Sequence, residues 1–377
     1  MLVIDADVDG FTSSAFVYSY LKNELAARVG CKFTLDYWIP EGKEHGLEVV
    51  IKTLRDKKRY DLIILPDSSS NNYEYHKELA ELGYDILVLD HHEAERYSTN
   101  AVVINNQLSG NYPNKALSGV GVVYKFFEYV ESRINDYGDF VGSLSELDHP
   151  SENYLDLVAL GEISDVMNMT TLENRWICDY GLSHINNAFF KEIIEKQAFS
   201  LKLEEGPLTQ IGVAFYITPL INALIRIGSQ LEKERLFQAF ITPYEKVPST
   251  KRGEKGQDEF IVTQAVRNCI NAKSRQTRER DKAAELLDIQ IMENCLDENK
   301  ILILNADELD VSTTLTGLCA MGVAAKYKKP VMLGRITPDG KYLKGSIRNK
   351  DGSPLKDFKK FLTDSELISF AEGRCGL

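Results

Sequence analysis

The sequence is poor in cysteine, and its cysteines do not occur in pairs. The 377 residues contain six of them, at positions 31, 178, 269, 295, 319 and 375, and no two stand at the CxxC spacing. This scatter argues against a disulfide framework or a zinc ribbon, and it favours a reducing compartment. We therefore expect the cysteines to be packing residues.

The chain also lacks a long apolar run and a signal-peptide pattern. No stretch approaches the ~20 apolar residues that span a bilayer, and the N-terminus enters a predicted strand at once. Hydrophobic residues make up 44% of the sequence, which is enough for sizeable cores, and 377 residues predict two or three domains. These features indicate a cytoplasmic protein.

A net basic charge is missing too. The formal net charge is −12, whereas proteins that bind nucleic acid usually carry a basic surface. The positive charge gathers in two places, first at Lys251, Arg252 and Lys255, and then at Arg267, Lys273, Arg275, Arg278, Arg280 and Lys282. Because Arg275, Arg278 and Lys282 are three and four residues apart, they share one face of a predicted helix. That face is either solvated, with Glu279 and Asp281 in compensation, or part of a groove that guides a strand.

Strands and helices alternate through residue ~135, which indicates an α/β fold with a doubly wound, mainly parallel sheet. The apolar runs predict strands near residues 2–5, 33–39, 61–66, 85–90 and 101–105. The helical periodicity predicts helices near residues 11–28, 46–57, 72–82 and 118–134. We find no internal repeat and no low-complexity segment.

The second half of the chain has a different organisation. Residues 138–153 are rich in turn formers, and residues 154–296 are mostly helical. A strand at 301–304 then opens a smaller α/β unit, with a helix near 312–327, a strand at 331–333 and a hairpin through 338–340. We expect a catalytic domain over residues 1–195, a mostly helical connector over 196–297 and a second domain over 298–377.

Acidic residues and histidines follow three of the predicted strands. Asp90, His91 and His92 come directly after the apolar run 85–89, and Asp67 comes after the run 62–66. Asp5, Asp7 and Asp9 follow the first strand in the same way. Because the carboxyl ends of parallel strands converge on one crevice, these side chains are expected to form one cluster.

Such a cluster needs a counter-charge, since neighbouring carboxylates raise one another's pKa. Oxygen and imidazole ligands together suit Mn²⁺ or Mg²⁺, and two ions about 3.5–4 Å apart are the usual arrangement for phosphoryl hydrolysis. A single aspartate after a strand is often only a helix cap, and a histidine pair is often only a polar loop. Three such strand ends together favour a metal site for phosphoester cleavage.

Four motifs resemble those of a known superfamily. VIDADVDG (3–10), LPDSSS (65–70), LDHHE (89–93) and GEISDVM (161–167) are similar in order and spacing to motifs I to IV of the DHH phosphoesterases. The similarity to RecJ-like single-strand-specific exonucleases continues through residues 117–126, 171–182, 213–228, 271–279 and 344–349, the last in a segment that resembles the DHHA1 domain. The resemblance covers nearly the whole chain.

The resemblance implies a role for each matching residue of the metal site. Asp7, Asp9, His91 and Asp165 match metal ligands, Asp5 matches a ligand or a supporting position, and Asp67 matches the carboxylate that bridges two ions. His92 matches the residue that faces the scissile phosphate. Asp90 is expected to orient an imidazole, as metal-bound histidines usually require.

The resemblance also implies residues that bind substrate. These candidates are Arg275 and Arg278 on the basic helix, Asn222 and Arg226 in the core stretch, and Gly345, Ser346 and Arg348 near the end. Small residues let backbone N–H groups approach a phosphate, and an arginine can bind it with two hydrogen bonds. Leu220 departs from the arginine that is common in this stretch.

The C-terminus departs from the family pattern. Relatives usually finish with a Gly-His-rich segment that contacts the nucleotide, whereas residues 370–373 read FAEG and only Arg374, Cys375, Gly376 and Leu377 follow. We expect a truncated or remodelled substrate end. Aromatic side chains after the DHH triplet, such as Tyr112, Tyr124 and Phe127, are expected to be core rather than base-stacking residues.

These observations predict a Mn²⁺- or Mg²⁺-dependent exonuclease that degrades single-stranded DNA, for which the resemblance implies 5′ to 3′ polarity. A first alternative is a DHH enzyme that acts on short oligoribonucleotides or cyclic dinucleotides. A second is a catalytically silent DNA-replication scaffold, although the complete ligand set argues against it. The physiological metal and the oligomeric state stay open.

Overall fold

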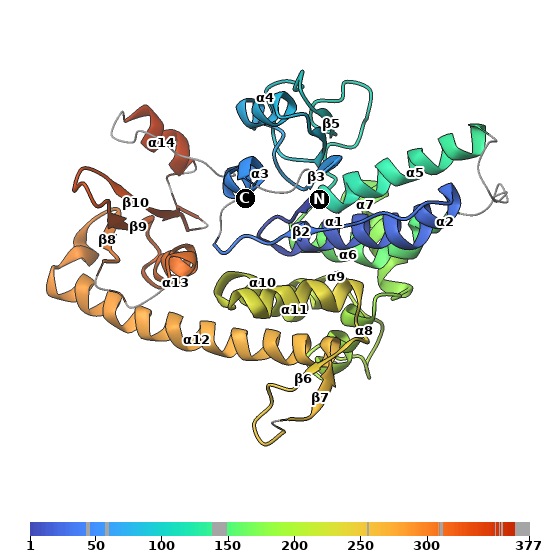
Figure 1. Ribbon diagram of the computed structural model, residues 1–377. Coiled ribbons are helices and arrows are strands. Elements are labelled where there is room, and N and C mark those ends of the chain that lie inside the picture. Colours follow the sequence, from blue (N-terminus) through green and yellow to red (C-terminus); the bar gives the residue numbers. More distant parts are fainter. Residues whose placement is uncertain are drawn as a thin grey trace. The chain divides into compact units, whose positions relative to one another are not determined.

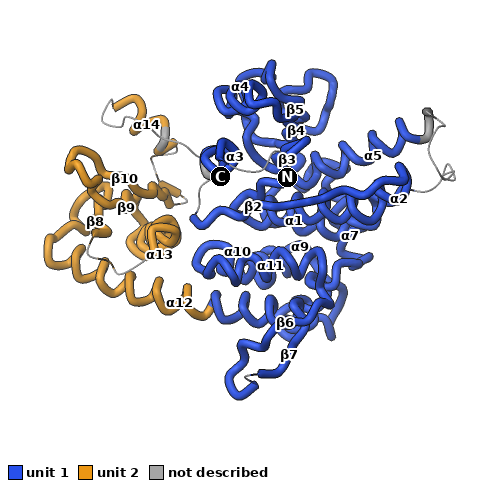
Figure 2. The backbone as a smooth tube through the Cα atoms, viewed as in Figure 1, with its two compact units in different colours: residues 1–273 blue, residues 274–377 orange. Residues whose placement is uncertain are grey.

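The computed structural model describes residues 1–42, 46–56, 60–137, 149–254, 256–307, 309, 312–350, 352–353, 355 and 357–365. The chain divides into two compact units, residues 1–273 and 274–377 (Figure 2). The long helix α12 (Ile261–Glu293) belongs to both units. The three-domain division expected from the sequence stays a prediction.

A five-stranded sheet organises the first unit (Figure 1). Its strands lie in the order β2-β1-β3-β4-β5 and every neighbouring pair is parallel. The strands are β1 (Leu2–Val3), β2 (Tyr37–Trp38), β3 (Leu62–Pro66), β4 (Asp85–Asp90) and β5 (Val102–Asn105). The doubly wound parallel sheet expected from the sequence is confirmed.

The strand order reverses between β1 and β3. From β1 the chain first adds β2 on one side and then crosses to β3 on the other. In open α/β sheets the crevice at such a reversal, outside the carboxyl ends of the strands, is where ligands bind. The aspartates that follow β1 and β3 are therefore placed at this crevice by topology alone.

Helical segments cover the sheet and build the rest of the first unit (Figure 1). They are α1 (Val8–Ser19), η1 (Tyr20–Leu25), α2 (Ala26–Val29), η2 (Gly46–Val49), α3 (Ile51–Asp56), α4 (Tyr73–Glu81), α5 (Gly119–Tyr137), η3 (Pro150–Tyr154), α6 (Leu155–Ser164), α7 (Leu172–Ser183), α8 (Ala188–Lys196), α9 (Gln210–Gly212), η4 (Val213–Ile217), α10 (Thr218–Ile227) and α11 (Gln230–Ile241). A short hairpin of β6 (Lys246–Pro248) and β7 (Asp258–Phe260) precedes α12.

Alternate residues of the central strands enter two different cores. Ile63 and Leu65 of β3 pack in one cluster with Leu54 of α3 and Leu79 of α4. Ile64, between them, packs in another cluster with residues of α1 and α5. Side chains alternate between the faces of a strand, so this sheet is covered on both faces. Each fully buried aliphatic side chain contributes roughly 1.5–3 kcal/mol.

One helical stretch among the described residues, Gln210–Ile227, is long and apolar enough to cross a membrane. This corrects the expectation that no stretch approaches that length. Half of it is buried in the fold, where Val213, Ile217 and Ile221 join the core cluster of Phe11. The core helix of a soluble protein can be equally long and apolar, so this stretch is weak evidence for a membrane span.

The second unit contains a mixed three-stranded sheet in the order β10-β9-β8. Its strands are β8 (Leu302–Asn305), β9 (Val331–Ile336) and β10 (Leu343–Arg348), and its helical segments after α12 are η5 (Leu296–Glu298), η6 (Thr313–Leu315), α13 (Thr316–Tyr327) and α14 (Phe358–Asp364). β8 and β9 are parallel, and β9 and β10 form the expected antiparallel hairpin. Gly340 turns this hairpin at φ +70°, a conformation that glycine adopts without strain.

His76 on α4 predicts a pH-dependent stability. Its side chain is buried, neither ring nitrogen has a hydrogen-bond partner among the described residues, and burial lowers its pKa from 6.5 to about 4. Between these two values the unfolded chain therefore binds a proton at His76 and the folded chain does not. The free energy of unfolding should fall, by at most roughly 3 kcal/mol, as the pH drops from 6.5 to about 4.

The measurement is urea unfolding in EDTA from about pH 7 to about pH 4 for the wild type and His76→Leu. Other titrating groups are shared by the two proteins, so the stability difference between them isolates His76. We expect the leucine variant to gain relative stability as the pH falls. A difference that is constant across this range would contradict the prediction.

Candidate metal centre

Seven side chains that can bind a cation lie close together near the carboxyl ends of β1, β3 and β4. They form three overlapping groups whose ligand atoms lie within 4.8 Å of one another, namely Asp67 with His91 and His92, Asp9 with His91 and Asp165, and Asp5 with Asp7 and Asp67. Asp67 and His91 each belong to two groups. The structure thus brings together every residue that the sequence proposed as a metal ligand.

Asp67, directly after β3, has a strained backbone conformation. Its φ is +62°, in the left-handed region that aspartate and asparagine tolerate better than most residues. Its backbone N–H donates to the carbonyl of Leu89 at 2.7 Å, which ties this turn to β4. Backbone strain of this kind tends to occur at functional sites, where the surrounding fold maintains it.

The Asp67 carboxylate is buried without a sufficient partner. Its Oδ1 accepts no hydrogen bond from any described residue, although His91 Nε2 lies 3.2 Å away. Burial, and then the charges of Asp9 and Asp7, raise its pKa well above the usual value. A cation would supply the missing counter-charge, so the carboxylate set fits a hard divalent metal ion.

Asp9 is held by the N-terminus of a helix. Its two carboxylate oxygens accept hydrogen bonds from the backbone N–H groups of Gly119 at 2.7 Å and Val120 at 3.1 Å. These residues begin α5, whose N-terminal end carries partial positive charge. Burial, with the charges of Asp165 and Asp7, nevertheless raises the pKa of Asp9 to about 7.

Asp7 and Asp165 stand at helix ends. Asp7 is the N-cap of α1 and accepts from the N–H of Gly10 at 2.9 Å. Asp165 is the C-cap of α6, and it is followed by Val166 at φ +56°, which is strained for a β-branched residue. Both aspartates therefore come to the cluster from well-defined helix ends rather than from loops.

His91 lies among three carboxylates. Its Nε2 is 3.2 Å from Asp67 Oδ1, 3.5 Å from Asp165 Oδ2 and 3.9 Å from Asp9 Oδ2. The imidazole is almost fully buried. A nitrogen surrounded by carboxylate oxygens is suitably placed to share a cation with them.

Asp90 orients the exposed histidine of the pair. His92 Nδ1 lies 2.8 Å from Asp90 Oδ1, and Asp90 also accepts from the N–H groups of His91 at 2.8 Å and Ser70 at 3.0 Å. Burial alone would raise the pKa of Asp90, but hydrogen bonds from His92 and Ser70 hold it below its usual range. Burial alone would lower the pKa of His92, but Asp90 raises it to about 9.

Three glycines make the close packing of the centre possible. A methyl group on Gly119 would lie 2.3 Å from Asp67 Oδ1, and one on Gly161 would lie 2.5 Å from Asp9 Oδ1. One on Gly10 would lie 2.5 Å from Asp5 Cβ. The only sequence signal for these glycines is that they lie inside or next to the motifs.

Asn222 and Arg226 lie on α10, and neither belongs to the three ligand groups. The Oδ1 atom of Asn222 is buried and accepts no hydrogen bond among the described residues. Their role in binding substrate stays a prediction. Tyr124 and Phe127 are buried in the core beside α1, as expected from the sequence.

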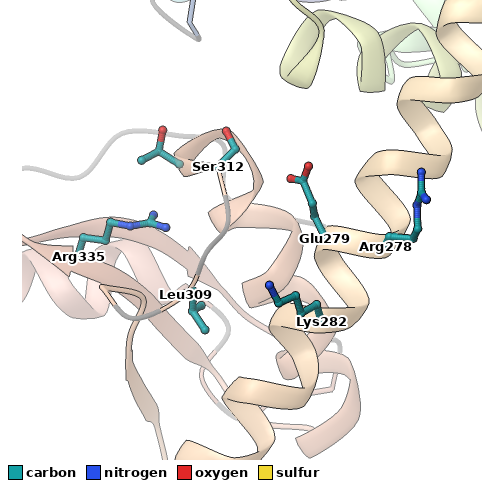
Figure 3. Close-up of a pocket in the computed structure, with 7 residues that line it drawn as sticks. Arg278, Glu279, Lys282, Leu309, Ser312 and Arg335 are labelled. Atoms are coloured by element: carbon teal, nitrogen blue, oxygen red, sulfur yellow. The ribbon is translucent and has the colours of Figure 1, made fainter.

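The other proposed substrate residues lie in the second unit. Arg278 lines a cavity of about 650 Å³ together with Lys282 and Glu279 of α12 and Arg335 of β9 (Figure 3), whereas Arg275 does not line it. Ser346 and Arg348 of β10 do not line this cavity, and both side chains lie against Gly317 of α13. A methyl group on Gly345 would lie 2.1 Å from the carbonyl oxygen of Leu333, so strand packing also requires this glycine.

Part of the expected basic charge is neutralised. Arg267 makes two hydrogen bonds of 2.6 Å to Glu259, and Arg280 pairs with Asp281 at 2.7 Å. Lys251 pairs with Glu254. Lys255 and the C-terminal residues 370–377, on which the expected truncation depends, lie outside the described residues.

Comparison with known proteins gives a consistent result. Residues 1–162 match the DHH family, N-terminal domain. The chain is 40% identical over 373 residues to the putative SPbeta prophage-derived single-strand DNA-specific exonuclease YorK of Bacillus subtilis strain 168. The aligned region covers 98% of this chain and 60% of that protein. It is 31% identical over 235 residues to the single-stranded-DNA-specific exonuclease RecJ of the same strain, and the aligned region covers 60% of this chain and 26% of that protein. The chain thus spans less than two thirds of the length of these relatives.

The fold matches that of solved proteins. The crystal structure of RecJ from Thermus thermophilus in complex with Mn²⁺ aligns with a TM-score of 0.69 at 22% identity, over 99% of this chain and 48% of that one. The α/β architecture predicted from the sequence is therefore confirmed over nearly the whole chain.

The contact between Gly119 and Asp67 gives a test of the centre. Gly119→Ala places a methyl group on Asp67 and must displace its carboxylate, so we expect Mn²⁺ affinity to fall by about tenfold or more. Gly110→Ala is the matched control, because nothing lies within 4 Å of a methyl group there. Isothermal titration of both variants with Mn²⁺ measures the effect. Equal affinities would show that this packing does not hold the metal ligands.

Proposed function

We propose that this chain, whose residues 1–162 match the DHH family, N-terminal domain, is a RecJ-like metal-dependent phosphodiesterase that hydrolyses single-stranded DNA from an end. The observation that carries the proposal is the buried carboxylate and histidine cluster, in which Asp67 Oδ1 accepts no hydrogen bond from any described residue. A cluster with this excess of negative charge is unstable without cations. Two Mn²⁺ or Mg²⁺ ions suit its oxygen and imidazole donors.

We assign the metal ligands from the three groups. Asp7, Asp9, His91 and Asp165 would hold the ions, with Asp5 beside Asp7. Asp67 and His91 each belong to two groups, but only the carboxylate has two oxygens to offer, so Asp67 would take the bridging position. When bound, the ions would supply Lewis-acid activation of the phosphate and of the attacking water. The N–H groups of Gly119 and Val120 fix the direction of the Asp9 carboxylate.

His92 is the group we assign to the scissile phosphate. Asp90 binds its Nδ1 and leaves Nε2 for a substrate, and the side chain of His92 is 52% exposed whereas that of His91 is 3% exposed. Asp90 raises the pKa of this imidazole and so favours its protonated form. A protonated imidazole can donate to a phosphate oxygen and stabilise the charge that develops there.

The substrate follows from the relatives, whose names describe exonucleases specific for single-stranded DNA. In this chain the guanidinium groups of Arg275, Arg278 and Arg348 could bind the phosphates of a DNA strand. Further candidates for binding the DNA are Asn222, Arg226, Gly345 and Ser346. Degradation from 5′ to 3′ and a cytoplasmic location belong to the same proposal. No observation favours oligoribonucleotides or cyclic dinucleotides, and the complete ligand set argues against a silent scaffold.

Asp67→Asn tests the metal centre without disturbing the backbone, because asparagine tolerates the positive φ of this position better than alanine does. Losing the bridging carboxylate should lower hydrolysis of single-stranded DNA about a thousandfold or more, roughly 4 kcal/mol of barrier. In EDTA the variant should be at least as stable as the wild type, because one repelling carboxylate has been removed. Turnover and thermal unfolding, each with and without Mn²⁺, measure both effects.

Asp85→Asn is the matched control, since Asp85 is an exposed aspartate at the opposite end of β4. It should behave like the wild type in every assay. Near-normal turnover of Asp67→Asn would rule out a bridging carboxylate at this position.

The form of the substrate gives an independent prediction. End-labelled single-stranded DNA should be degraded much faster than the same sequence as a blunt duplex. The difference should persist at low salt, where general electrostatic attraction to phosphates is strongest. A time course of labelled products on both substrates is the measurement, and equal rates would contradict the single-strand assignment.

A further inference from the structure

Glu162 is a buried carboxylate that does not belong to the ligand groups. It lies on α6, three residues before Asp165, and its side chain is fully buried. Its Oε1 accepts from the backbone N–H of Ser118 at 2.9 Å, and its Oε2 accepts from Asn174 Nδ2 at 2.9 Å. Both donors are neutral, and a buried carboxylate without a cationic partner is costly. Such a group calls for a reason beyond packing.

The position of Ser118 supplies that reason. Its N–H is followed along the chain by those of Gly119 and Val120, which hold the carboxylate of Asp9 at 2.7 and 3.1 Å. Three successive N–H groups at the start of α5 are thus divided between Glu162 and Asp9. A displacement of Ser118 must move the two donors that orient Asp9.

Asn174 connects Glu162 to the segment that leads into α5. It is fully buried on α7, and its Nδ2 also donates to the carbonyl of Ala116 at 2.5 Å. Its Oδ1 accepts from Asn114 Nδ2 at 2.7 Å. One amide therefore holds both the carboxylate of Glu162 and the chain just before the helix.

The space around Glu162 allows little movement. A methyl group on Gly121 of α5 would lie 2.4 Å from Glu162 Oε1. The glycine lets the carboxylate lie against the first turn of the helix, where its partner Ser118 also lies. Contacts of this kind around metal ligands typically change metal affinity by 10–100-fold when they are lost.

We propose that Glu162, held by Asn174, is a positioning residue that sets the metal affinity of the centre by fixing the N-terminus of α5 against Asp9. The inference rests on the proposed function, because it assigns Asp9 as a metal ligand. Glu162 itself lies outside the three groups of candidate ligands. Its effect is transmitted through Ser118, Gly119 and Val120.

Two substitutions test this role in different ways. Glu162→Gln keeps the shape but adds a donor, so the amide can satisfy either Ser118 or Asn174 and not both. Gly121→Ala keeps the charge of Glu162 and displaces its carboxylate. Alanine in a helix is otherwise favoured over glycine by about 1 kcal/mol, so helix propensity cannot explain a loss. Gly110→Ala, with open space around it, is the control.

The full chain is titrated with Mn²⁺ by calorimetry, its unfolding is followed in EDTA, and kcat and KM are measured on single-stranded DNA. We expect Glu162→Gln and Gly121→Ala each to weaken Mn²⁺ binding by about tenfold or more and to lower kcat at limiting Mn²⁺. The KM for DNA should stay unchanged, and Gly110→Ala should match the wild type.

Each other outcome overturns the inference. Lower stability in EDTA with unchanged Mn²⁺ affinity would mean that Glu162 is only structural. Weaker Mn²⁺ binding in Glu162→Gln but not in Gly121→Ala would mean that the charge of Glu162 affects the metal affinity and that its position does not. A wild-type chain that binds no Mn²⁺ and cleaves no DNA would instead refute the proposed function, and the inference would fall with it.

Discussion

Mutual repulsion between buried carboxylates is the constraint on which the rest of the structure depends. Asp5, Asp9 and Asp67 are at most 2% exposed and meet at the reversal of strand order between β1 and β3. The parallel sheet brings them together because the strands on either side of this point end at the same edge. The fold therefore creates a local excess of negative charge that bound cations, or protons in their absence, would relieve.

The surrounding elements hold this cluster in place, and the backbone next to the cluster is strained as a result. Helix α5 presents its N-terminal N–H groups to Asp9, and Gly119 lets the same helix end approach Asp67. Asp67 and Val166 accept left-handed backbone conformations next to the ligands. Strained residues and close-packed glycines in one place indicate that the position of the carboxylates matters more here than local stability.

Much of this could be predicted from the sequence because it follows from local patterns. Apolar runs ended by acidic residues predict both the parallel strands and the meeting of Asp67 with His91. Contacts between distant segments could not be predicted in this way, since they depend on tertiary packing. The contacts of Glu162 with Ser118 and of Gly119 with Asp67 both belong to this class.

The most direct test of the central claim is the binding of Mn²⁺ to the purified chain. Calorimetric titration, combined with thermal unfolding in EDTA and in excess Mn²⁺, reports both the number of ions and their linkage to folding. We expect saturable binding of about two ions per chain and a higher unfolding temperature with metal. Absence of saturable binding, or the same unfolding temperature in both conditions, would contradict it.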